Sequence, residues 1–311
     1  MSDGRGRGGD PVWWAALNQV EGVGPATMLR LARTFGSAEA AVAASQTDLI
    51  ARGRLTAEQA AGVRRQSDSI AELRARIAAW ERAGIRLLSM GDPGYPWRLL
   101  DLKTPPPLLY LRGSILPEDD RSVAIVGSRE ATSEGEAIAF ELARGLAERG
   151  FTNVSGLAHG IDTAGHRGSL AAPSGRTLAI LGSGLLRVYP PDNAGLAAEI
   201  ANRGCLLAEV PPESEVNRRF LLARDRLQAA LARAVIVVQA RRECGSIVTA
   251  THALGCRRLL LATPWEEGPF AEGWRKLKSM GAIPVDGDTN LDALAERLLT
   301  AEPSAQQDAL L

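Results

Sequence analysis

The stretch "SVAIVGSREATSEGEAIAFELARGLAERGFTNVSG" (residues 122–156) decides the fold. It opens with a short apolar run, continues with a segment of helical periodicity, and closes with a second apolar run and a small-residue turn. Parallel strands need a long crossover connection, which is most often a helix, and this alternation supplies one. The stretch therefore predicts a βαβ unit.

The same alternation continues to residue 263, so a doubly wound α/β fold with a mostly parallel sheet is expected. The helical segments are "IDTAGHRGSLAA" (161–172), "RDRLQAALA" (224–232) and "SIVTATHALG" (246–255), and the strands are "RTLAILG" (176–182), "CLLAE" (205–209), "AVIVVQA" (234–240) and "RRLLLAT" (257–263).

A small all-helical domain is expected before the sheet, over residues 1–80, followed by the α/β domain at 81–300 and a polar tail at 301–311. In the helical part, "VEGVGPAT" (20–27) joins two amphipathic segments, with Pro25 suited to a first helical position. This turn is similar to a helix-hairpin-helix that presents amides to a DNA phosphate, and a plain turn between helices explains it equally well. Two short strands, "IRLLS" (85–89) and "LLYLRG" (108–113), are expected to join or flank the sheet.

The composition gives no sign of a polyanionic partner, since 36 basic residues balance 36 acidic ones. Three cysteines, Cys205, Cys244 and Cys256, form no CxxC pair, which argues against a zinc site or a disulfide framework and for a reducing compartment. No run approaches the length of a membrane span, and the N-terminus is a polar leader, so a cytoplasmic location without membrane or metal is expected.

Four predicted strand ends carry small or polar residues where α/β sheets bind ligands. Glycines let backbone amides approach an anion, the following helix N-terminus favours it, and hydroxyls add donors. Neither G-x-G-x-x-G nor the P-loop pattern is present, so a mononucleotide or a nucleic-acid backbone fits better than a dinucleotide. The four groups are Gly127, Ser128 and Arg129; Ser155, Gly156 and Gly160; Gly182, Ser183 and Gly184; and Gly245, Ser246 and Thr249.

A basic segment, "NRRFLLARDRLQAALAR" (217–233), adds five arginines against one acid, Asp225. We expect it to lie at the same sheet edge and to neutralise phosphates, with a solvated helix face as the alternative. Asp162 and His166 are four residues apart, a spacing that favours a hydrogen-bonded pair securing the helix start over a catalytic base. His159, His252 and Cys244 are interpreted as non-catalytic.

The chain resembles the DNA-processing protein A (DprA, or Smf) family. The resemblance rests on five ordered motifs: "YPWRLL" to "PPPLLYLRG" (95–113), "VAIVGSRE" (123–130), "VSGLAHGIDTAGHRGSL" (154–170), "TLAILGSGLLRVYPPDNAGL" (177–196) and "CGSIVTATHAL" (244–254). It implies a sterile-alpha-motif or helix-hairpin-helix domain, then an extended Rossmann-like domain that binds single-stranded DNA without a cofactor. It also implies protection of incoming strands in natural transformation, loading of the recombinase RecA, and a homodimer.

The resemblance maps the basic DNA pocket onto Arg129, the glycine and serine turns onto its wall, and two further arginine positions onto Arg224 and Arg226. The family's F-P-x-R-N-R segment departs here to "FLLARDR" (220–226), which lacks the proline and places Asp225 between the arginines. That carboxylate either weakens phosphate contact or orients both guanidiniums as a clamp.

Two other functions use the same turns. A phosphoribohydrolase of nucleoside monophosphates is an enzyme of related fold, but its "PGGxGTxxE" turn corresponds to "ECGSIVTATHA" (243–253), where no glutamate follows the turn. A nucleotide sensor needs no base at all. A DNA-binding protein that is not an enzyme is the preferred interpretation.

Overall fold

The computed structural model describes residues 9–300, so the first eight residues and the predicted tail at 301–311 lie outside the described range. The chain begins with a helical unit whose helices start at recognisable signals. Pro25 occupies the first turn of α2, and Thr56 forms a capping box with Gln59 at the start of α5. The six helices are α1 (Pro11–Asn18), α2 (Pro25–Phe35), α3 (Ala38–Ala43), α4 (Gln46–Ala51), α5 (Ala57–Asp68) and α6 (Ile70–Arg82).

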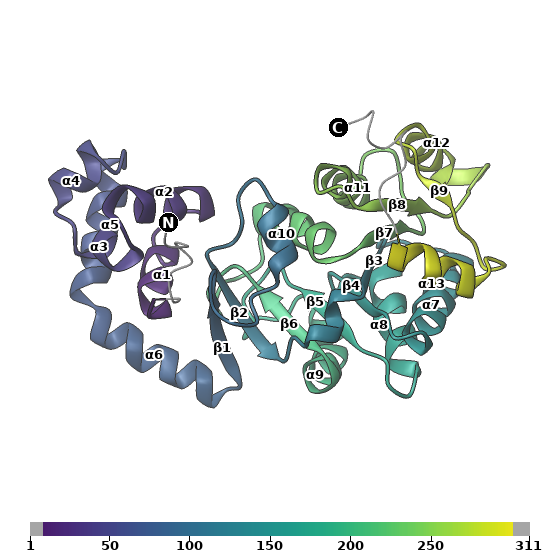
Figure 1. Ribbon diagram of the computed structural model, residues 1–311, viewed down its shortest axis with the longest axis horizontal. Coiled ribbons are helices and arrows are strands. Elements are labelled where there is room, and N and C mark those ends of the chain that lie inside the picture. Colours follow the sequence, from purple (N-terminus) through teal and green to yellow (C-terminus); the bar gives the residue numbers. More distant parts are fainter. Residues whose placement is uncertain (1–8, 301–311) are drawn as a thin grey trace.

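Nine strands follow and form one sheet in the order β1-β2-β6-β5-β4-β3-β7-β8-β9 (Figure 1). The strands from β6 to β9 in that order are all parallel, whereas β2 is antiparallel to both β1 and β6. This confirms the predicted doubly wound, mostly parallel sheet. The strands are β1 (Ile85–Ser89), β2 (Leu108–Gly113), β3 (Ser122–Val126), β4 (Thr152–Ser155), β5 (Thr177–Ile180), β6 (Cys205–Ala208), β7 (Ala234–Val237), β8 (Leu259–Ala262) and β9 (Ile283–Pro284).

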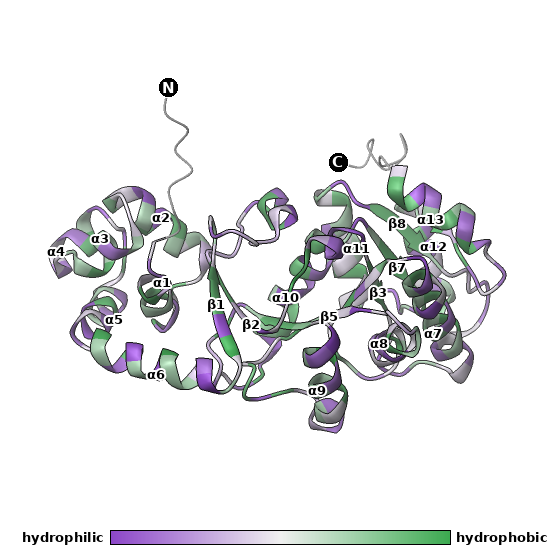
Figure 2. Cartoon of the chain, turned by 60° about the horizontal axis from the view of Figure 1, so that its bottom comes forward, coloured by the Kyte–Doolittle hydropathy of each residue, from purple (hydrophilic) through white to green (hydrophobic). Residues whose placement is uncertain are grey.

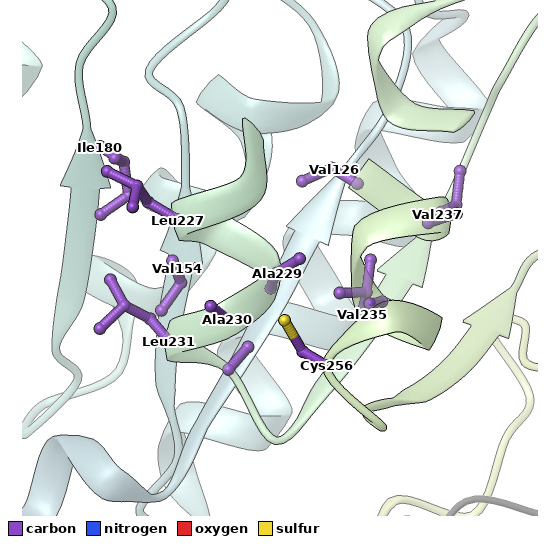
Figure 3. Close-up of a cluster of buried hydrophobic side chains, with 14 of the residues drawn as sticks. Val126, Val154, Ile180, Leu227, Ala229, Ala230, Leu231, Val235, Val237 and Cys256 are labelled. Atoms are coloured by element: carbon purple, nitrogen blue, oxygen red, sulfur yellow. The ribbon is translucent and has the colours of Figure 1, made fainter. Parts of the chain in front are cut away.

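Helices cover both faces of the sheet, which is why the central strands β3 and β7 are buried at every position. Along β3, Ala124 and Val126 pack on one face with helices α10 and α11, and Val123 and Ile125 pack on the other with α7. Figure 3 shows the first of these cores. The helices are α7 (Ser133–Glu148), α8 (Ile161–Ala171), α9 (Ala194–Arg203), α10 (Arg218–Leu231), α11 (Gly245–Gly255), α12 (Ala271–Ser279) and α13 (Leu291–Thr300).

The helical unit shares a hydrophobic core with the outer part of the sheet. Tyr110 on β2 is fully buried, packs edge-to-face on Trp80 of α6 at 5.8 Å, and donates to Asn18 Oδ1 at 3.1 Å. Glu213, after β6, accepts a 2.6 Å hydrogen bond from Trp80 Nε1. Hydropathy follows this packing, with apolar strands between helices that carry hydrophilic residues on their outer sides (Figure 2).

Strand order reverses between β3 and β7, because β4 to β6 lie on one side of β3 and β7 to β9 on the other. At such a point the loops leaving the two strands run in opposite directions and leave a crevice. Any ligand site of a doubly wound sheet is expected there. Within residues 9–300 no helix is both long and apolar enough to cross a membrane.

Candidate nucleic-acid interface

A cavity of about 700 Å³ opens where the strand order reverses. Loops after β3 and β7 and the first turns of α10 and α11 line it. It gathers residues more than a hundred positions apart in the sequence, as the rule for parallel sheets predicts. We call it the switch-point cavity. Seven of the predicted site residues line it: Gly127, Ser128, Arg129, Arg224, Gly245, Ser246 and Thr249.

The floor of the cavity depends on a close approach of three chain segments at Gly127. A methyl group added at Gly127 would lie 2.6 Å from Ile161 Cγ1 and 2.9 Å from the carbonyl oxygen of Gln239. Ile161 in turn donates its backbone N–H to the carbonyl oxygen of Ser128 at 3.2 Å. A glycine is therefore needed at position 127 to bring the three segments together beneath the cavity.

Two exposed arginines, Arg129 and Arg218, line the cavity without an ion-pair partner among residues 9–300. A third lining arginine, Arg241, is paired with Glu130 at 3.0 Å at the exposed rim. An unpaired guanidinium is free to form a bidentate contact with a phosphate. The cavity thus offers the exposed guanidinium groups of Arg129 and Arg218 to an anionic ligand.

Two helices point their N-termini at the cavity. At α10, Asn217 accepts a hydrogen bond from the backbone N–H of Phe220 at 2.8 Å, which caps the first turn. At α11, the N-cap residue Cys244 makes no side-chain cap, so the first amides of this eleven-residue helix are left for another acceptor. Helix N-termini and unpaired arginines together favour a negatively charged ligand.

Beneath the cavity lies a buried charged group centred on Arg224, which is only 6% exposed. Its Nε lies 3.0 Å from Asp225 Oδ1 and its Nη2 lies 3.9 Å from Asp162 Oδ2, while Nη1 donates to the carbonyl oxygen of Ile180 at 3.1 Å. Burial raises the pKa of Asp162, although Arg224 and the amides of Ala158 and Gly156 oppose the shift. Arg224 therefore contributes a fixed charge from below.

The remaining predicted site residues do not line the switch-point cavity. Ser155 is fully buried and donates to the carbonyl oxygen of Ile125 at 2.7 Å, and Ser183 is buried as well. Gly156 and Gly182 instead give room to α10, because added methyl groups would lie 1.1 Å from Arg224 Nη1 and 2.8 Å from the Leu221 backbone. Arg226 donates to the carbonyl oxygen of Thr104 at 2.9 Å and forms an ion pair with Glu209.

The expectation that the arginines of 217–233 share one sheet edge is wrong. Helix α10 is about 20 Å long at 1.5 Å per residue, so its two ends lie at opposite edges of the sheet. Arg233 pairs with Asp120 at 2.9 Å beside the start of β3, far from the cavity. Arg226 pairs with Glu209 and Asp225 pairs with Arg224, so Asp225 does not clamp both neighbouring arginines.

The expected hydrogen bond between Asp162 and His166 does not form. Asp162 accepts from the backbone N–H groups of Gly156 and Ala158, at 3.1 and 3.3 Å, and so fixes the turn before its helix by itself. His166 is fully buried with Nδ1 2.7 Å from Thr177 Oγ1, and burial lowers its pKa to about 3. It does not line the cavity.

Comparison with known proteins settles the family. The model of the DNA recombination-mediator protein A family matches residues 86–298. The chain belongs to the DNA recombination-mediator protein A family. The Smf protein of Synechocystis is 34% identical over 82% of the chain and 65% of its own length, and DprA of Bacillus subtilis is 34% identical over 67% and 71%. The chain thus spans just under two thirds of the first of these relatives.

Two solved structures of DprA proteins share the fold. DprA from Streptococcus pneumoniae superimposes with a TM-score of 0.77 at 27% identity, covering 92% of this chain and 97% of its own. DprA from Helicobacter pylori, whose structure concerns a single-stranded DNA binding mode, gives a TM-score of 0.62 at 28% identity over 70% and 97%. These likenesses confirm the DprA resemblance.

Several lining residues of this DprA-family cavity were missed from the sequence: Tyr189, Asn217, Leu221 and Arg241. Arg241 directly follows the strand predicted at 234–240, so the strand-end rule could have found it. Tyr189 and Asn217 come from irregular loops after β5 and β6, where periodicity gives no signal. Within residues 9–300 no group of three His, Cys, Asp or Glu side chains could hold a metal ion.

Proposed function

We propose that the protein binds single-stranded DNA in the switch-point cavity and acts in DNA processing during natural transformation. The observation that carries this proposal is that Arg129 and Arg218, which have no ion-pair partner among residues 9–300, line the same cavity as the start of α11, which lacks a side-chain cap. Phosphates release counterions when they meet such a site, and this supplies most sequence-independent affinity. The named binding mode of the H. pylori relative supports the choice of single strands.

The cavity also suits the unstacked bases of a single strand. Tyr189 is 40% exposed and Leu222 is 44% exposed at its rim, and a flat ring beside a basic groove is a stacking platform for bases. The cavity offers guanidinium groups and the amides of a helix N-terminus, which are donors to phosphate, so sequence discrimination is expected to be weak. Binding without bond cleavage is the proposed activity.

We further propose that the protein protects incoming strands, loads RecA onto them, and acts as a homodimer without a cofactor in the cytoplasm. The support is family membership, with relatives named DNA processing protein DprA in B. subtilis and S. pneumoniae. Assembly of RecA on a strand coated with single-strand binding protein, with and without this protein, tests the loading step. Unchanged assembly would remove that part of the proposal alone.

The test of the binding step is fluorescence anisotropy of a labelled oligo-dT strand over a series of salt concentrations. Arg129→Ala should weaken binding and lower the salt slope by about 0.7, the value for one single-strand phosphate contact. The matched control is Arg297→Ala, because Arg297 is exposed and lies far from the cavity. Its helix, α13, ends at the opposite edge of the sheet, where the carbonyl oxygen of Leu299 accepts a hydrogen bond from Arg233. The control should bind like the wild type.

The nucleotide sensor and the hydrolase are the outcomes that would replace this proposal. Absence of strand binding at low salt, together with nucleoside monophosphates that raise Tm, would favour the sensor. Release of free base from a monophosphate would favour the hydrolase. Equal weakening by Arg129→Ala and Arg297→Ala would mean that binding reflects surface charge rather than this cavity.

A further inference from the structure

The carboxylate of Asp225 occupies the part of the switch-point cavity that attracts an anionic ligand. The residue lines the cavity and is 7% exposed. Its Oδ1 lies 3.0 Å from Arg224 Nε, and a methyl group added at Gly245, the first residue of α11, would lie 3.3 Å from its Oδ2. The carboxylate therefore sits between the buried guanidinium and the helix N-terminus, the two features that attract an anion from below.

The charge of the cavity shows how much this carboxylate matters. Four arginines and three carboxylates line it, which leaves one net positive charge. Glu130 is already paired with Arg241 at the rim, and Asp162 is occupied by two loop amides. Asp225 lies inside the cavity, and loss of its charge would raise the net charge of the lining residues from one to two. The lining arginines are Arg129, Arg218, Arg224 and Arg241, and the lining carboxylates are Glu130, Asp162 and Asp225.

We propose that Asp225 competes with nucleic-acid phosphate for the positive potential of Arg224, Arg129 and the start of α11, and so limits how tightly the cavity binds DNA. This inference rests on the proposed function. The pairing of Arg224 is poor in one respect: its Nε has no aligned hydrogen bond despite the 3.0 Å separation. A pair without that alignment compensates the guanidinium charge less fully than an aligned charge-assisted hydrogen bond does.

The competition between Asp225 and phosphate depends on the protonation of the Asp225 carboxylate. Burial raises the pKa of Asp225 to about 6, Arg224 opposes the shift, Asp162 of α8 adds to it, and Arg129 opposes it. Gly245 of α11 adds no charged side chain. A phosphate bound beside Asp225 would raise this pKa further, so binding takes up a proton. Affinity should therefore rise as the pH falls from 8 through about 6.

The experiment measures oligo-dT affinity by anisotropy from pH 5.5 to pH 8 at constant salt, for the wild type and two variants. Asp225→Asn keeps the shape of the side chain and removes its charge. At pH 8 this variant should bind the strand about five-fold more tightly than the wild type, which is the effect expected for one unit charge at an effective dielectric constant between those of protein and water. At pH 5.5 the variant and the wild type should bind equally tightly, because Asp225 of the wild type is then mostly protonated. Its affinity should be nearly independent of pH.

The matched control is Glu130→Gln, which removes one charge from the rim of the same cavity. Glu130 is exposed and paired with Arg241, so this variant should tighten binding while keeping the wild-type dependence on pH. That difference separates Asp225 from a general effect of net charge.

Three results would overturn the inference. One is a wild-type affinity that does not change between pH 8 and pH 6, which needs no variant. Another is Asp225→Asn binding no more tightly than the wild type at pH 8, and a third is the variant keeping the wild-type slope. If Arg129→Ala still weakens strand binding in these cases, the proposed function survives; if the wild type does not bind the strand at low salt, both fail.

Discussion

The contact between Gly156 and Arg224 gives a sharp test of how the switch-point cavity is supported. Gly156 has no positive φ, so its backbone accepts alanine, but the added methyl would lie 1.1 Å from Nη1 and 2.0 Å from Cζ of Arg224. The guanidinium must then leave its place. It would lose the Ile180 hydrogen bond and abandon the buried carboxylates of Asp162 and Asp225.

Breaking a buried ion pair from one side costs about 3–5 kcal/mol. Each kcal/mol lowers Tm by about 2–4 °C in a protein of this size class, so Gly156→Ala should lower Tm by roughly 6–20 °C. The control is Gly195→Ala on α9, where nothing lies within 4 Å of the added methyl. It should raise stability by up to about 1 kcal/mol, because alanine favours helix.

A double-mutant cycle identifies the cause. Arg224→Ala removes the clash, so adding Gly156→Ala to that variant should cost close to nothing beyond the cost of Arg224→Ala itself. Differential scanning calorimetry of the four proteins gives the coupling. An equal loss of Tm from Gly156→Ala in both backgrounds would falsify the reasoning, as would a wild-type Tm in the single variant.

Two further predictions concern stability. Asn217→Ala should lower the free energy of unfolding by about 0.5–2 kcal/mol, because it removes the cap of α10, whereas Asn217→Asp should keep the cap. Urea unfolding of the two variants measures the difference, and equal losses of stability would refute the capping role. In the folded state the pKa of His166 is lowered to about 3, whereas in the unfolded chain the imidazole takes up a proton near pH 6.5. Stability is therefore lost as the pH falls from 6.5 toward 3, and the loss should be about 1.4 kcal/mol at pH 5.5. His166→Asn should flatten that slope, and an unchanged slope would assign it to other groups.

The fold was predictable because its signals are local. Apolar runs of four or five residues alternate with helical periodicity from residue 122 onward, and only a parallel sheet with helices on both faces accommodates that pattern. The two strands before it, at 85–89 and 108–113, were also predicted, although their antiparallel pairing was not. Pairing direction depends on contacts far apart in the chain.

The site was predicted less completely, for a physical reason that Gly127 and Gly156 illustrate. Both directly follow buried strands and both are required to be small, but Gly127 lines the cavity while Gly156 makes room for Arg224. A glycine looks the same in a sequence whether a ligand or a buried side chain approaches it. Likewise, a run of arginines on one helix does not reveal that its members point to different ends of the sheet, as Arg218 and Arg233 do.

The shared core between the helical unit and strand β2 affects how the protein can be rearranged by evolution or by design. Trp80 and Tyr110 interlock across that boundary, and Glu213, which holds Trp80, lies four residues before Asn217 at the cavity rim. Exchanging the helical unit for another module would therefore require a redesigned outer face on β2 and a new anchor for the loop that leads into α10. The helical unit and the outer strands therefore depend on one shared core, and grafts cut at residue 83 should fail to fold.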